Sequence, residues 1–254
     1  MLYSNGMGTI KEKNIKKVNK VLNMVDLITL RENVSLEEIE RCDVKKPRVM
    51  VTADPAFNLQ SATNERAEEI LSEFSVDKDA KLIAVSVREC ANLPEDFAQE
   101  MASCLDAIAK KGYMPVFIPM QKSADLAISL SIAGKMKEQS RVIDCDLSIA
   151  DMLAIIGKCS IVCGMRLHML IFASVMNVPM AGIAYDPKIR GFMEYMNQKT
   201  YVELDGFEKE KFTEMALSAI ENADEMKKRL AEQSVPLRRK ARENAALAIE
   251  LLNL

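Results

Sequence analysis

The sequence predicts an α/β fold with a parallel sheet, on two observations. Short apolar, β-branched runs alternate with longer helical patterns through most of the 254 residues, which is the order of βαβ units. The runs are almost continuously apolar rather than alternating, as expected for strands covered on both faces. A chain of this length buries roughly 70–75% of its unfolded surface, enough for one or two hydrophobic cores.

The individual elements follow from these runs and periods. Strands are predicted at 27–30, 49–53, 82–87, 115–119, 142–144, 160–163, 179–184 and 201–204. Helices are predicted at 36–41, 65–73, 95–110, 124–137, 148–158, 166–177 and 208–220.

Local signals predict where some helices begin and end. Ser35 with Glu38 is expected to cap the short helix beside them, and Ser148 with Asp151 forms an approximate capping box for the helix that follows. Gly112 should end the helix before it, because glycine readily adopts the left-handed conformation of a helix C-terminus.

A domain boundary is predicted near 75–80, where SVDKDAK interrupts the pattern before a new strand. We therefore expect a remnant of an N-terminal α/β domain over 1–76, a Rossmann-like domain over 77–220 and a charged helical tail over 221–254. The acidic and basic residues of the tail nearly balance, which indicates a solvated amphipathic helix, with an interruption expected at Pro236.

Composition excludes several classes of protein. The formal net charge is −3, without the basic excess of a dedicated nucleic-acid binder. Six cysteines are too few for a disulfide scaffold and indicate reduced thiols. No signal peptide is recognisable, and the most apolar stretch, 169–184, is too short to cross a bilayer. We expect a cytoplasmic protein with at most peripheral membrane association. No metal site is predicted, because three nearby residues match no standard zinc spacing: Cys159, Cys163 and His168.

The most informative stretch is SIVCGMRLHMLIFASVMNVPMAGIAYDPK, residues 160–188. A strand ends, Gly164 permits a tight turn, and a helix begins with Arg166 and His168 in its first turn. Ligands of open α/β sheets bind beside the carboxyl ends of strands, and helix N-termini favour anions. We interpret His168, the single histidine, as a functional residue, with a packed core histidine as the alternative. Positions i and i+2 do not share a helix face, so Arg166 would have to reach across the helix end.

Arg88 follows another predicted strand, LIAVSV. Together with Arg166 it would bind a small, highly charged anion, because a guanidinium is a planar fork suited to carboxylate or phosphate. A surface arginine is the alternative reading. Asp186, in the segment YDPK, either caps the next helix or contributes to catalysis.

The segment CGMRLHMLIFASVMNVPMAGIAYDPK resembles the polysaccharide pyruvyltransferase family through its RLH triplet, the apolar helix after it, GIAYDPK and the following Phe192. Further matches stand in the family's order: NGMGTI, VDLITLREN, VTADPAF and AVSVRE. The resemblance implies a glycosyltransferase-B-like fold, with a Rossmann-like parallel-sheet domain and a long C-terminal helix. It also implies an incomplete first domain, because the chain begins at a point well inside that domain of the family.

The resemblance further implies transfer of pyruvate from phosphoenolpyruvate to a sugar of a cell-wall or exopolysaccharide precursor, forming a pyruvate ketal. His168 would be the catalytic acid/base, and Arg166 and Arg88 would hold the donor in the 77–220 domain. Further substrate-binding positions are expected at Gly164, Leu167, Asp186 and Lys188. Phosphoenolpyruvate would be a donor substrate and no cofactor is implied. The other partner would be a glycan or lipid-linked saccharide acceptor, with no nucleic acid.

Two other readings stay open. A nucleotide-sugar-dependent glycosyltransferase would share the architecture, because fold does not fix function. An inactive truncated remnant would instead bind a partner through its unfinished first domain. Exposed strand edges on a partial sheet would also favour a homo-oligomer.

Overall fold

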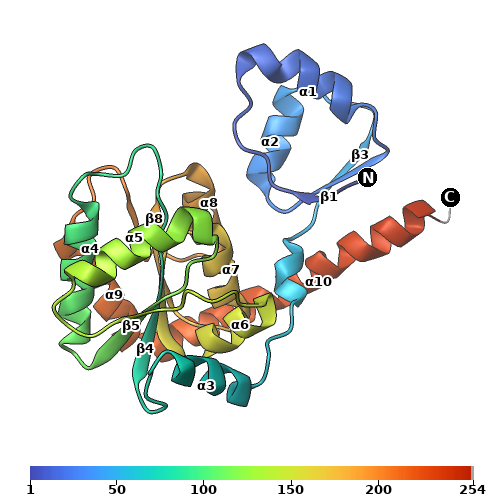
Figure 1. Ribbon diagram of the computed structural model, residues 1–254. Coiled ribbons are helices and arrows are strands. Elements are labelled where there is room, and N and C mark those ends of the chain that lie inside the picture. Colours follow the sequence, from blue (N-terminus) through green and yellow to red (C-terminus); the bar gives the residue numbers. More distant parts are fainter. Residues whose placement is uncertain (253–254) are drawn as a thin grey trace. The chain divides into compact units, whose positions relative to one another are not determined.

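The computed structural model describes residues 1–252, in which strands and helices alternate along the chain (Figure 1). The strands are β1 Leu2–Asn5, β2 Leu27–Leu30, β3 Arg48–Val51, β4 Lys81–Ser86, β5 Tyr113–Phe117, β6 Arg141–Val142, β7 Cys159–Gly164, β8 Met180–Ala184 and β9 Tyr201–Glu203. The helices are α1 Ile15–Leu22, α2 Asn33–Arg41, α3 Asn64–Glu73, α4 Phe97–Ala109, α5 Lys122–Lys135, α6 Ile149–Gly157, α7 Leu167–Val175, α8 Pro187–Tyr195, α9 Lys209–Glu221 and α10 Ala223–Leu252. Two short 3₁₀ helices lie at Glu12–Asn14 and Pro55–Asn58.

The chain forms two compact units, each with its own parallel sheet. The first unit comprises Met1–Leu59 and the chain from Glu232 onward, and the second unit comprises Gln60–Ala231. These units divide the chain at residues other than the sequence-based 76/77 and 220/221. Helix α3 belongs to the second unit because it packs on α6, where the Ala62 amide donates to the Ala150 carbonyl at 2.9 Å.

The first unit is built on a three-stranded sheet in the order β1-β2-β3. Its core consists of Leu22, Ile28, Leu30 and Ile39. Strand β1 was not predicted, because its sequence LYSN is short and half polar. Helix α1 was also missed, since among its residues only Leu22 is buried.

The predicted cap at Ser35 is wrong. Helix α2 begins at Asn33 with Glu32 in the N-cap position, so Ser35 lies inside the helix. Its buried hydroxyl accepts the Met7 amide at 2.7 Å and donates to the Glu32 carboxylate at 2.8 Å. A long-range contact therefore uses the hydroxyl that local sequence reasoning assigned to the helix end.

The second unit is built on a six-stranded parallel sheet in the order β6-β5-β4-β7-β8-β9. The chain leaves β4 toward β5 and β6, then returns across it to place β7 on the other side. The order therefore reverses between β4 and β7, and in open α/β sheets the crevice at such a switch point is where ligands bind.

Helices cover both faces of this sheet. Ile83 and Val85 of β4 and Ile161 and Cys163 of β7 share a core with the apolar residues of α4 and α9. Alternate strand residues face the other side, where α6 and α7 pack on β7. Burial on both faces explains why these strands are continuously apolar in the sequence.

Several local predictions are confirmed. Ser148 and Asp151 form a complete capping box at the start of α6. Gly112 follows the end of α4 with a positive φ of 89°, the conformation that favours glycine.

The expected interruption at Pro236 is wrong, because α10 runs through it without a break. The proline is exposed, whereas its neighbours Ser234 and Leu237 are buried. Packing of the opposite helix face offsets the loss of one backbone hydrogen bond. Across the described residues, no helix combines the length and apolarity required to span a membrane.

Candidate anion-binding site

The candidate site lies at the switch point of the second unit, at the carboxyl ends of neighbouring parallel strands. Arg88 follows β4, Arg166 and His168 follow β7, and the YDPK segment follows β8. The start of α5, after β5, lies at the same sheet edge. The structure thus brings the candidate residues that follow β4, β7 and β8 to one edge.

The turn between β7 and α7 is tight. Gly164 pairs in register with Ser86 of β4, and a Cβ at this glycine would lie 3.1 Å from the Leu170 side chain. The absence of a side chain therefore lets α7 begin close to the sheet. The N-cap residue Arg166 makes no side-chain capping bond, and the Met169 amide donates to the Arg166 carbonyl at 3.0 Å. The positive end of the helix dipole at this terminus favours an anion. Leu167 is buried, so its backbone amide rather than its side chain faces this helix end.

His168 stands in the first turn of α7 with an exposed side chain. Its ring is tilted against Phe172, with 6.2 Å between the ring centroids. The alternative of a packed core histidine does not describe this residue. The imidazole is exposed at the N-terminal end of α7.

Arg166 is held by a carboxylate that sequence reasoning missed. Its Nε lies 3.1 and 3.0 Å from the two carboxylate oxygens of Asp125, and its Nη2 also contacts that carboxylate. Nη2 further donates to the Gln121 side chain at 3.3 Å. Asp125 is completely buried in the first turn of α5. Arg166 therefore links the segments after β5 and β7.

Arg88 is held by an aromatic partner that sequence reasoning also missed. Its Nη1 donates to the Tyr185 hydroxyl at 2.8 Å, and its guanidinium carbon lies 5.0 Å from the ring centroid. Its Nε donates to the Glu89 carbonyl at 3.2 Å. Lys188 Nζ lies 5.7 Å from the same ring. Two cationic side chains, Arg88 and Lys188, therefore lie near the Tyr185 ring.

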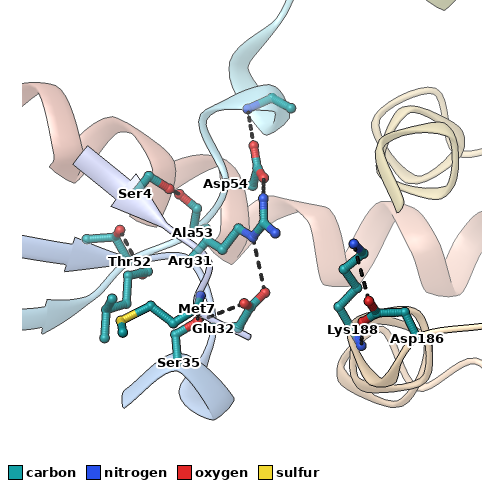
Figure 2. Close-up of polar contacts among 12 residues, drawn as sticks. Ser4, Met7, Arg31, Glu32, Ser35, Thr52, Ala53, Asp54, Asp186 and Lys188 are labelled. Atoms are coloured by element: carbon teal, nitrogen blue, oxygen red, sulfur yellow. Dashed lines mark hydrogen bonds and ion pairs between the residues drawn. The ribbon is translucent and has the colours of Figure 1, made fainter. Parts of the chain in front are cut away.

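Asp186 has the structural role that the sequence left open. It is the N-cap of α8, where its carboxylate accepts the Lys188 amide at 3.0 Å. The Lys188 ammonium also pairs with it at 3.5 Å, as Figure 2 shows. Lys188 is exposed, so its ammonium stands at the rim of the edge.

Two buried side chains beside the site further constrain its chemistry. Ser86, the last residue of β4, is completely buried, and its hydroxyl has no hydrogen-bond partner among the residues described; such unsatisfied groups are rare. Burial raises the pKa of the Cys163 thiol to about 12, so this cysteine stays protonated near neutrality and is no nucleophile.

The charge of this edge suits an anion. Arg166 pairs with Asp125 and Lys188 with Asp186, whereas no ion pair of Arg88 is found among the described residues. Within residues 1–252, no group of three or more His, Cys, Asp or Glu side chains is arranged to hold a metal ion. What the edge offers is guanidinium groups, open helix amides and one imidazole, which suit a carboxylate or a phosphate.

Comparison with protein families assigns the chain. The family model described as polysaccharide pyruvyl transferase matches residues 1–187. The chain belongs to this family. A curated relative, the amylovoran biosynthesis protein AmsJ of Erwinia amylovora, is 25% identical over 202 residues, which are 73% of this chain and 49% of AmsJ. The chain thus spans about half the length of this relative.

Solved structures confirm the fold. A glycosyltransferase from Rickettsia africae superposes with a TM-score of 0.67 at 13% identity, covering 97% of this chain and 69% of that one. The UDP-GlcNAc 2-epimerase of Neisseria meningitidis, solved with UDP-GlcNAc, gives a TM-score of 0.64 at 12% identity, covering 90% and 62%. At such low identity the likeness concerns the fold alone, and it confirms the predicted glycosyltransferase-B-like α/β architecture.

Proposed function

We propose that this chain transfers pyruvate from phosphoenolpyruvate to a sugar of a cell-wall or exopolysaccharide precursor, forming a pyruvate ketal. The proposal rests on one observation above all. In a member of the polysaccharide pyruvyl transferase family, two arginines, an uncapped helix N-terminus and an exposed histidine meet at the switch point of one sheet. Phosphoenolpyruvate carries both a carboxylate and a phosphate, which are the groups that such donors recognise.

In the proposed reaction, Arg88, Arg166 and the amides of α7 bind and orient the donor. A proton adds to the methylene carbon, which becomes the methyl group, and a sugar hydroxyl attacks the neighbouring carbon. The carbon–oxygen bond to phosphate then breaks, and a second hydroxyl closes the ring. The two hydroxyls release two protons, of which one balances the proton taken up by carbon and the other leaves with phosphate. His168 moves these protons, and the arginines stabilise the charge on the departing phosphate.

The partners and location follow from the same proposal. The acceptor is a glycan or lipid-linked saccharide, the reaction takes place in the cytoplasm, and any membrane association is peripheral. No redox step occurs, so the donor needs no cofactor beside it.

Calorimetric titration tests the donor, with a uridine diphosphate sugar as the comparison ligand. Selective binding of phosphoenolpyruvate supports pyruvyl transfer. Binding of the nucleotide sugar alone would replace it with glycosyl transfer. Binding of neither ligand, together with a mass that rises with concentration in light scattering, would favour a partner-binding remnant.

Replacing the histidine tests the mechanism. We expect His168→Ala to lower turnover by at least about 100-fold, the usual contribution of a general acid or base. Donor affinity should stay within a few-fold, because the arginines remain. Steady-state kinetics and calorimetry on the same variant separate the two effects, and unchanged turnover would remove His168 from the mechanism.

A further inference from the structure

Asp125 is the most unusual charged group at the candidate site. It is completely buried on α5, on the same helix face as Ile128, Ser129 and Ile132, which are also buried. A carboxylate on the apolar face of a helix is costly unless it is paired. Its cationic partner, Arg166, comes from 41 positions further along the chain.

The second role of Asp125 does not require a charge. Its carboxylate accepts the backbone amide of Gln121 at 2.9 Å, which helps to satisfy the start of α5. An asparagine or serine side chain could accept such a bond equally well. The pairing with a distant guanidinium therefore calls for a separate explanation.

The geometry supplies that explanation. Asp125 engages one edge of the guanidinium, formed by Nε and Nη2. The Nη1 group of Arg166 makes no hydrogen bond within the part of the chain that the structure describes. The Asp125–Arg166 ion pair joins the segments after β5 and β7. These strands are the two neighbours of β4, so the ion pair lies near the end of β4, which Arg88 follows.

We infer that Asp125 is a positioning residue, which fixes the direction in which Arg166 presents Nη1 to an anionic donor at the switch point. The inference rests on the proposed function for its ligand, phosphoenolpyruvate. Charge and positioning predict opposite outcomes when Asp125 is neutralised. Loss of a negative charge by itself would tighten anion binding, whereas loss of positioning weakens it.

The matched variants are Asp125→Asn and Asp106→Asn. Asp106 is another buried aspartate of the second unit, which accepts the amides of Lys137 and Glu138 but holds no arginine. It therefore controls for the loss of a buried carboxylate that accepts backbone bonds. Thermal unfolding of both variants verifies that they are folded.

The first measurement needs no ligand. The Nε–H resonance of Arg166, identified by its absence in Arg166→Lys, should exchange slowly with solvent in the unaltered chain. We expect at least tenfold faster exchange in Asp125→Asn and no change in Asp106→Asn. Unchanged exchange in Asp125→Asn would overturn the inference.

The second measurement is calorimetric titration with phosphoenolpyruvate. We expect affinity to fall about fivefold or more in Asp125→Asn, to stay unchanged in Asp106→Asn, and to show no further loss when Asp125→Asn is added to Arg166→Ala. Equal or tighter binding in Asp125→Asn would overturn the role in donor binding. If the unaltered chain does not bind phosphoenolpyruvate, the proposed function fails, and the exchange measurement alone decides whether Asp125 positions Arg166.

Discussion

In each unit an arginine follows a strand of the parallel sheet, but the contacts of this arginine differ between the two units. In the first unit, Arg31 follows β2 and contacts two carboxylates, Glu32 and Asp54, each at 3.3 Å (Figure 2). In the second unit, Arg88 follows β4 and contacts a neutral phenol and a carbonyl. The first arginine forms two ion pairs, whereas the two side-chain hydrogen bonds of the second go to uncharged groups.

This difference teaches that position at a strand end does not by itself determine the contacts of an arginine. Arg31 is also closely packed, since a Cβ on Gly6 would lie 2.4 Å from its Nη2. Arg31 therefore contacts segments that follow all three strands of the first sheet: β1, β2 and β3. The number and placement of its carboxylate partners distinguish Arg31 from Arg166, which contacts a single carboxylate, that of Asp125, through Nε and Nη2.

The largest effect expected from this comparison is that of Arg88→Ala. Loss of a charge-assisted hydrogen bond costs about 1.5–3 kcal/mol, so affinity for phosphoenolpyruvate should fall about 10- to 100-fold. Arg31→Ala should leave that affinity within twofold and instead lower the stability of the first unit, because Glu32 and Asp54 lose their cation. Calorimetry and urea unfolding on both variants measure the contrast. A greater loss of affinity in Arg31→Ala than in Arg88→Ala would reverse it.

A smaller effect is expected away from the site, for Ser148→Ala. Loss of this N-cap should lower the free energy of unfolding of the second unit by about 1 kcal/mol and leave donor affinity unchanged. Hydrogen bonding from Ser148 lowers the pKa of the Asp151 carboxyl. A carboxyl whose pKa is lowered by folding stabilises the protein above its unfolded pKa, and this contribution disappears as the pH falls through the lowered value. The difference in stability between the variant and the unaltered chain should therefore shrink as the pH falls through the lowered pKa of Asp151. It should not vanish, because the bond from the Asp151 amide to the Ser148 hydroxyl does not titrate; a difference that did not change with pH would contradict this account.

The smallest effect expected is that of Tyr185→Phe. This change removes the hydroxyl that accepts from Arg88 but keeps the ring beneath the guanidinium, so donor affinity should fall about two- to fivefold, equivalent to roughly 0.4–1 kcal/mol. Tyr185→Leu removes the ring as well and should cost more. Titration of both variants orders the two contributions, and equal losses would assign the whole effect to the hydroxyl.

The sequence was sufficient to predict the parallel strands of the second unit, but not the bounds of that unit or its side-chain pairings. The strands of the second unit are predictable because each is buried on both faces and therefore has a continuously apolar sequence. Arg88 and the turn that contains Arg166 and His168 share one edge of the sheet. This placement follows once β4 and β7 are known to be neighbours. Tyr185 stood inside the segment YDPK, yet its contact with Arg88 spans 97 positions, which no local rule specifies.

One signal for Asp125 was present in the sequence and went unused. The residue stands three and seven positions before Ile128 and Ile132, so it occupies the apolar stripe of its own predicted helix. An acidic residue at such a position implies a buried partner. The identity of that partner still required the sheet order, because β5 and β7 are separated by β4.

The division of the chain into units has a consequence for its synthesis. Residues 60–231 are continuous, so the second unit can complete its contacts while translation continues. The first unit cannot, because Asn244, which is completely buried on α10, lies 2.8 Å from the Thr52 hydroxyl and donates to the Ala53 carbonyl at 3.0 Å. Residues 192 positions apart must therefore come together before the packing of its strands is complete. The second unit ends at Ala231, so its whole sequence is translated between the strands of the first unit and the helix that completes their packing.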